Sequence, residues 1–133
     1  MSRDGKGNGN AGVNRLLEIR RGDYERDCKA FLDWLLPQMV WDMAPQAFLM
    51  DAYRAWCEQE GRRPLSKTRF YGACEWAAWN GMLGAWGPCK RKGGDGMRVR
   101  FVVDQPVAEK LGLDQWQPSK GFRPRSMYVG LGR

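Results

Sequence analysis

Histidine is absent from this sequence of 133 residues, which removes the commonest general base and the usual partner of a Ser or Cys nucleophile. No glycine-rich loop precedes a Lys-Ser or Lys-Thr pair, so the phosphate-cradling motif of nucleotide hydrolases is missing too. The scattered carboxylates Asp23, Asp27, Asp42 and Asp51 are typical of helix starts and solvated faces. They make a metal-dependent nuclease the weakest functional hypothesis, and we expect a protein that is not an enzyme and has no cofactor.

Closely spaced cysteines are lacking as well. The four cysteines are Cys28, Cys57, Cys74 and Cys89; none forms a C-x-x-C pair, and no histidine is present to complete a zinc site. A free cysteine at an apolar helix position behaves as a small hydrophobic residue. The sequence therefore predicts structural free thiols and no bound metal.

Long apolar runs are also missing, which argues against a membrane span. The N-terminus is rich in Gly and Asn where a signal peptide would need an apolar segment, so we expect a cytoplasmic protein. Residues 1–12 offer almost nothing to bury and are predicted to be a disordered tail. Residues 13–133 have the length of one domain. A short helical turn is expected at its start, with Leu16 and Leu17 docked on the body.

What the chain has in excess is positive charge, and that charge is concentrated. The net charge is +7, and residues 61–100 alone hold 9 basic and 2 acidic side chains. A basic window of this kind is typical of a surface that binds the phosphates of DNA or RNA. A solvated, solubilising face is the alternative interpretation.

Helical periodicity dominates the first part of the chain. Apolar residues recur at helical spacing from Asp23 to the region of Pro37, and again from Asp42 or Ala44, with Pro45 in the first turn, up to Gly61. Ser66 is the expected N-cap of a third helix that ends at Asn80-Gly81. The buried stripe of this helix is predicted to be Phe70, Ala73, Cys74 and Ala77. Two helices joined by a short Gly/Pro turn predict a helix-turn-helix unit.

The remainder favours short strands. Residues 82–86 and 97–103 are predicted strands, a strand is expected within 126–131, and a short helix over 106–113. Between the first two strands, three cations and a Gly-rich turn are typical of a β-wing, although they also suit a surface loop whose charges prevent edge aggregation. The expected fold class is α+β. More narrowly, we expect a winged helix-turn-helix: a three-helix body, a small antiparallel β-wing sheet and a basic C-terminal extension.

The candidate DNA-binding residues are polar or basic side chains outside the buried stripes. Those near the turn and the start of the third helix can meet phosphates and base edges in a major groove. Those of the wing can meet the backbone. The full set is Arg62, Arg63, Ser66, Lys67, Thr68, Arg69, Tyr71, Lys90, Arg91, Lys92 and Arg98.

One segment also supports a family resemblance. Residues 48–70 carry Tyr53, Trp56-Cys57, an acidic pair, Gly61, Pro64-Leu65-Ser66 and Phe70. This arrangement resembles the C-terminal winged-helix domain of phage and plasmid primase-helicases, and residues 128–131 are similar to its final strand. The sequence lacks the family's Walker motif and primase domain, and its insert over 104–122 is longer. The resemblance implies DNA binding during phage or plasmid replication, with other replication proteins as further partners.

Two classes of function therefore stay open. The favoured hypothesis is a DNA-binding module that prefers duplex to single-stranded DNA, in a replication protein or in a small phage or plasmid transcriptional regulator. The other is a protein-protein docking module, since the sequence contains seven tryptophans that could hold a partner. Phosphate contacts release counterions, so a steep salt dependence of DNA binding would separate the first class from the second.

Overall fold

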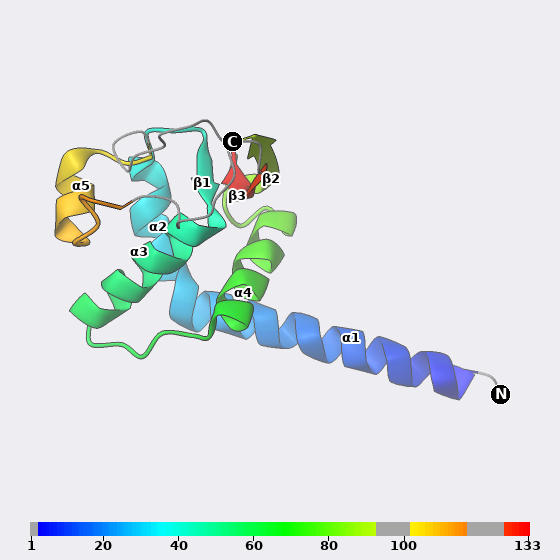
Figure 1. Cartoon of the computed structure of the whole chain (residues 1–133). Helices are drawn as coiled ribbons and strands as arrows, with labels where there is room; N and C mark the ends of the chain where they lie inside the picture. The colour runs from blue at the N-terminus through cyan, green and yellow to red at the C-terminus, as the bar shows by residue number, and fades with distance from the viewer. Residues whose placement is uncertain (1–2, 93–101, 117–126) are drawn as a thin grey trace.

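The computed structural model describes residues 3–92, 102–116 and 127–133, and the side chains of 12–90, 102–116 and 130–133. Figure 1 shows a body of short helices beside a small sheet, from which α1 extends. The elements are α1 (Arg3–Asp23), the π-helical turn η1 (Tyr24–Cys28), α2 (Lys29–Leu35), the 3-10 turn η2 (Leu36–Gln38), β1 (Met43–Pro45), α3 (Gln46–Gln59), α4 (Lys67–Trp79), β2 (Gly87–Lys92), α5 (Gln105–Lys110) and β3 (Met127–Gly132). The fold is α+β, as predicted from the sequence.

The sheet is antiparallel and has the strand order β1-β3-β2. Gly132 of β3 lies opposite Met43 on one side and Gly87 on the other, so β3 is the central strand. A small antiparallel sheet was predicted, and the expected strand near residue 131 is present as β3. The short strand β1 was not predicted, because its three residues directly precede α3 and resemble the first turn of that helix.

Two strand predictions differ from the structure. Residues 82–85 form turns, because Gly81 and Gly84 have φ angles of 68° and 62°, which no extended strand can contain. The strand β2 begins later and uses residues 87–92, part of which was expected to form the wing loop. Of the predicted strand at 97–103, only Val102 and Val103 lie within the described residues, and Val103 forms an isolated bridge with Met39.

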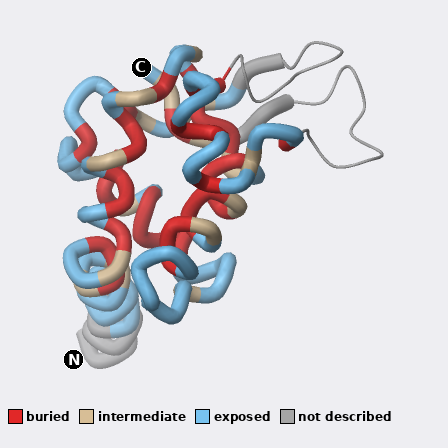
Figure 2. Tube along the Cα trace, turned by 90° about the vertical axis from the view of Figure 1, so that its left-hand side faces the viewer, coloured by how far each residue is buried: buried red, intermediate tan, exposed pale blue. Residues whose placement is uncertain are grey.

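The core lies between α2, α3 and α4, where three aromatic rings meet. Tyr53 stacks on Phe70 with ring centroids 4.2 Å apart, and Phe31 meets the Tyr53 ring edge-on at 5.5 Å. All four residues predicted for the buried stripe of α4 are buried. Figure 2 shows the buried residues on the inner sides of the helices. Packing of these inner faces fixes the position of α4.

The ends of α3 and α4 follow the sequence closely. The Ser66 hydroxyl accepts a hydrogen bond from the Arg69 backbone N–H at 3.3 Å and caps α4 as predicted. Gly61, just after α3, has a φ of 67°, the left-handed conformation that ends many helices. The first helical residue of α3 is Gln46, and Pro45 stands one position before it. The end of α3 and the start of α4 therefore lie where the sequence predicted them, with a loop over residues 60–66 between the two helices.

The helix α1 differs from the expected disordered tail and docked turn. It is one helix from Arg3 to Asp23, and Leu16 and Leu17 are 48% and 42% exposed. Helix nucleation is the costly step, and the buried turn after Asp23 provides a formed end from which α1 continues. The C-terminal end of α1 packs against α4 and the rest of the helix extends away from the body (Figure 1), so Leu16 and Leu17 stay exposed. None of the helices in the described part of the chain is both long and apolar enough to cross a membrane.

Candidate nucleic-acid interface

The first candidate residues lie at the N-terminal end of α4. Lys67 and Thr68 are exposed, and the Lys67 ammonium lies 5.9 Å from the centroid of the Tyr71 ring. Backbone N–H groups at a helix start, together with the helix dipole, attract anions. This end of α4 therefore presents a hydroxyl, a cation and a partial positive charge on one exposed surface.

Arg69 occupies a different position from the one predicted. Its guanidinium donates two hydrogen bonds to the Asp23 carboxylate, at 2.9 Å from Nε and 2.5 Å from the second nitrogen. Asp23 is only 1% exposed, and Arg26 approaches it at 3.6 Å. The hydrogen bonds from Arg69 to Asp23 raise the pKa of the guanidinium, because they stabilise its charged form. Arg69 thus holds α4 against the end of α1, a role that its position outside the buried stripe did not reveal.

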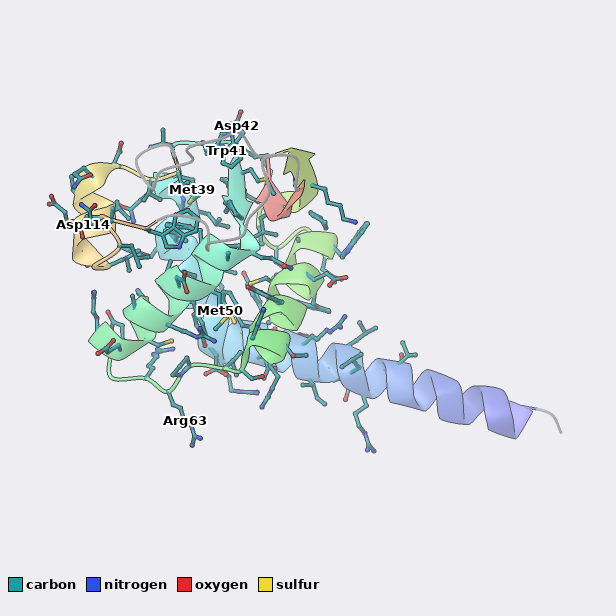
Figure 3. The ribbon with its side chains drawn as sticks, in the orientation of Figure 1. Met39, Trp41, Asp42, Met50, Arg63 and Asp114 are labelled. Atoms are coloured by element: carbon teal, nitrogen blue, oxygen red, sulfur yellow. The ribbon has the colours of Figure 1, made fainter. Side chains whose placement is uncertain are left out.

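The two arginines of the α3–α4 loop also differ from each other. The Arg62 guanidinium lies 5.3 Å from the centroid of the Trp56 ring and donates to the Arg26 carbonyl oxygen at 3.2 Å. Arg63 extends from the loop into solvent, as Figure 3 shows. Of the two, Arg63 is therefore the one whose guanidinium can meet a phosphate without leaving another part of the fold.

Tyr71 is half-buried, and its hydroxyl donates a hydrogen bond to the Gln46 carbonyl oxygen at 3.0 Å. Burial raises the pKa of this phenol above its ordinary value. Its hydroxyl is committed to α3, so Tyr71 contributes its ring rather than a base contact to the surface.

The remaining candidates lie at the other end of α4. Lys90 is exposed on β2, and the backbone of Arg91 and Lys92 pairs with β3 opposite Tyr128 and Met127. Arg98 lies outside the described residues. β2 contacts α4, which runs from the α3–α4 loop to the sheet in Figure 1. The 13 residues of α4 span about 20 Å at 1.5 Å per residue, so the candidates form two groups separated by the helix.

Charge on these two groups is largely uncompensated. Among the side chains that the structure describes, Arg63, Lys67 and Lys90 have no carboxylate within ion-pair distance. Elsewhere, Arg21 and Lys29 each pair with a carboxylate four residues later, whereas other described cations such as Arg54 and Lys110 form no ion pair. Unpaired cations are thus present at both ends of α4, but they are not confined to them.

Two parts of this surface were not found from the sequence. Arg20 of α1 lies across α4 at Gly72, where an added Cβ would come within 3.0 Å of the Arg20 Nε. The second part is a cavity beside α4 that includes Trp79 and Glu75. Trp79 and Glu75 are recognisable in the sequence as residues outside the buried stripe, but the helix crossing and the strand beside them are tertiary features without a local signal.

The cysteines offer no metal site in the described part of the chain, which contains no group of three metal-ligating residues. Cys28, Cys57 and Cys74 are buried, and burial raises the pKa of each thiol. Cys89 is half-buried on β2. The first three thiols are therefore held in the neutral form at ordinary pH, as core residues.

Comparison with known proteins finds no matching protein-family model, no matching curated protein and no matching solved structure. The likeness of residues 48–70 to the primase-helicase domain therefore stays a prediction. Support for a function comes from the geometry and charge around α4.

Proposed function

We propose that this chain is a DNA-binding module with a winged-helix architecture, which contacts duplex DNA through α4 and the basic strand β2. The main support is the placement of unpaired cations at both ends of one capped helix, beside a strand that carries three basic residues in sequence. The element order supports it as well. The helices α2, α3 and α4 are followed by two paired strands, and β1 completes the sheet.

The dimensions of DNA suit this arrangement. A major groove is about 12 Å wide and admits one α-helix, with phosphates on both sides. With α4 in the groove, Lys67 and Arg63 reach the backbone at one end of the helix, and Lys90 and its neighbours reach it at the other. Thr68 is exposed in the first turn of α4, and we propose that it contacts a base edge. Arg69 stays on Asp23 and contributes only by holding α4 in place.

The proposed setting is the replication of a phage or plasmid, with DNA as the main partner and no chemistry of its own. The resemblance of residues 48–70 supports this setting, because the segment covers most of α3, the loop and the start of α4. A small transcriptional regulator would use the same surface. A docking module for another protein is the second candidate, and the 71% exposure of Trp79 favours it.

The proposal is tested by measuring the affinity of the full chain for a labelled duplex and for a single strand of the same length. Titration of salt between 50 and 200 mM should give a steep fall in duplex affinity, with about 0.9 in the log–log slope for each phosphate contacted. Lys110→Ala is the control for the loss of one positive charge away from α4, since α5 lies across the body from α4 in Figure 1, and it should leave the salt slope unchanged. Undetectable duplex binding, or a slope near zero, would reject DNA in favour of a protein partner.

A further inference from the structure

A cavity of about 390 Å³ lies between the start of α3, the outer side of α4 and the strands β2 and β3. Its floor is apolar and includes the buried side chains of Leu49, Cys74 and Leu131. Trp79, Glu75 and Lys90 also line it and are all exposed. Ligand sites are typically apolar hollows with a few converging polar groups, and this volume lies at the small end of their range.

The exposed lining residues point to the chemistry of a ligand. The Trp79 side chain is 71% exposed, which leaves an aromatic surface open for stacking. Within the described side chains, Glu75 and Lys90 pair neither with each other nor with another charged group. The cavity thus combines an aromatic surface, an anionic acceptor and a cation.

We propose that this cavity takes one unstacked nucleotide base that carries an amino group, with cytosine as the reference case. The base stacks on the Trp79 indole, its exocyclic amine donates to the Glu75 carboxylate, and Lys90 neutralises its phosphate. This inference rests on the proposed DNA-binding function. It adds that the surface between α4 and β2 recognises an unpaired nucleotide within or beside a duplex.

Other occupants fit the lining less well. A phosphate alone would be repelled by Glu75, which lies in the same cavity. An apolar side chain of a partner protein would contact Trp79, but it would take water from the Glu75 carboxylate without offering hydrogen bonds in its place. An amino-bearing base satisfies all three groups at once, since it is flat, donates hydrogen bonds and is attached to a phosphate.

The experiment uses three labelled duplexes: one fully paired, one with a single unpaired cytosine and one with a single unpaired thymine. Wild-type protein should bind the cytosine duplex most tightly. Trp79→Ala should lower affinity for the cytosine duplex by about 5- to 150-fold, the range measured for base–aromatic stacking, and leave the paired duplex unchanged. Trp79→Phe should retain part of the preference. Because Trp79 is exposed, neither variant should change the melting temperature.

Glu75→Ala tests whether the Glu75 carboxylate recognises the amine of the base or only repels the phosphates of DNA. If Glu75 only repels phosphate, its removal should tighten binding to all three duplexes equally. If it accepts the amine, Glu75→Ala should abolish the preference for cytosine over thymine, and this is the result we expect. A uniform gain in affinity would overturn the inference.

Cys89 provides an independent readout because it lines the cavity and is half-buried, whereas Cys74, which also lines the cavity, is buried like the other two cysteines. A thiol reagent should modify Cys89 alone in the folded protein, and the cytosine duplex should slow that reaction more than the paired duplex does. Equal affinity for the three duplexes and equal protection of Cys89 would overturn the base inference while leaving DNA binding intact, and would favour a protein side chain as the occupant. Absence of binding to every duplex would instead reject the proposed function, and the inference with it.

Discussion

The flank of α4 that faces α1 and the flank that faces β2 each begin with a cation, and only the first of these cations is paired. On the closed flank, which consists of Arg69, Gly72 and Trp76, each residue meets a partner from α1 or η1. Arg69 binds Asp23, Gly72 accommodates Arg20, and the Trp76 ring centroid lies 5.9 Å from that of Tyr24.

The open flank consists of Lys67, Glu75 and Trp79, and neither of its two charged side chains has an ion-pair partner among the described side chains. Lys67, Glu75 and Trp79 are exposed, and the last two line the cavity next to Lys90. Position on a helix therefore does not decide whether a cation is free to meet a ligand. The partner packed beside the helix decides it.

The largest expected effect comes from a substitution in the buried face of α4, which holds both flanks in position. Phe70→Ala should lower the free energy of unfolding by about 3–5 kcal/mol, because the ring is fully buried between Tyr53 and Phe31. Chemical denaturation measures this change in the free energy of unfolding, with Thr68→Ala as a surface control on the same helix. A destabilisation below about 1 kcal/mol would show that α4 is held in some other way.

The next largest effect comes from a substitution that disrupts the closed flank alone. Arg69→Ala should lower the melting temperature more than Lys67→Ala does, because it leaves the buried Asp23 carboxylate without its two hydrogen bonds. Arg69→Lys should restore only part of the stability, since an ammonium cannot reproduce the two-pronged contact. In the double variant with Asp23→Ala the two destabilisations should not add, because both changes remove the same pair. Additive effects would contradict the pairing.

On β2, which faces the open flank, changing Lys90, Arg91 and Lys92 together to Ala should weaken binding to every duplex by a similar factor. The magnitude of the log K versus log salt slope should fall by about 1–3, at about 0.9 for each phosphate that is no longer neutralised. Salt titrations on two unrelated duplexes measure this, and thermal melting checks that the fold survives. An unchanged slope would mean that β2 does not touch DNA.

The smallest effect concerns the pH dependence of stability. Burial raises the pKa of Cys28 and Cys74 above the ordinary thiol value of 9.0. A group with a raised pKa in the folded state contributes its full stabilisation below the unfolded pKa, so stability should begin to fall as pH rises above about 9. Denaturation at pH 7, 9 and 10 measures the change. Cys74→Ala should reduce the fall.

Much of the helical part of the fold could be predicted because its signals are local. The cap at Ser66, the end of α3 at Gly61 and the buried stripe of α4 follow from residue types and 3.6-residue spacing. The strands were harder. β1 has three residues and gains its hydrogen bonds from β3, almost ninety residues later, so nothing local distinguishes it from a helix start.

The candidate site could be predicted only as a set of residues. Their separation into two groups depends on the direction of α4. The hydrogen bonds of Arg69 depend on Asp23, which is 46 residues away in the sequence. Arg20 was missed for the same reason, since its place over Gly72 arises from the crossing of two helices. Periodicity identifies the side of a helix that leaves the core, but it does not identify what a neighbouring element places there.

The most direct test of the two flanks compares Lys67→Ala with Arg69→Ala in salt titrations of duplex binding, at a temperature where both variants are folded. We expect Lys67→Ala to lower the slope by about 0.9, the value for one phosphate, with stability unchanged. We expect Arg69→Ala to leave the slope at the wild-type value and to lower the melting temperature. The reverse pattern, with the slope reduced on changing Arg69 and kept on changing Lys67, would contradict the division of α4 into a closed and an open flank.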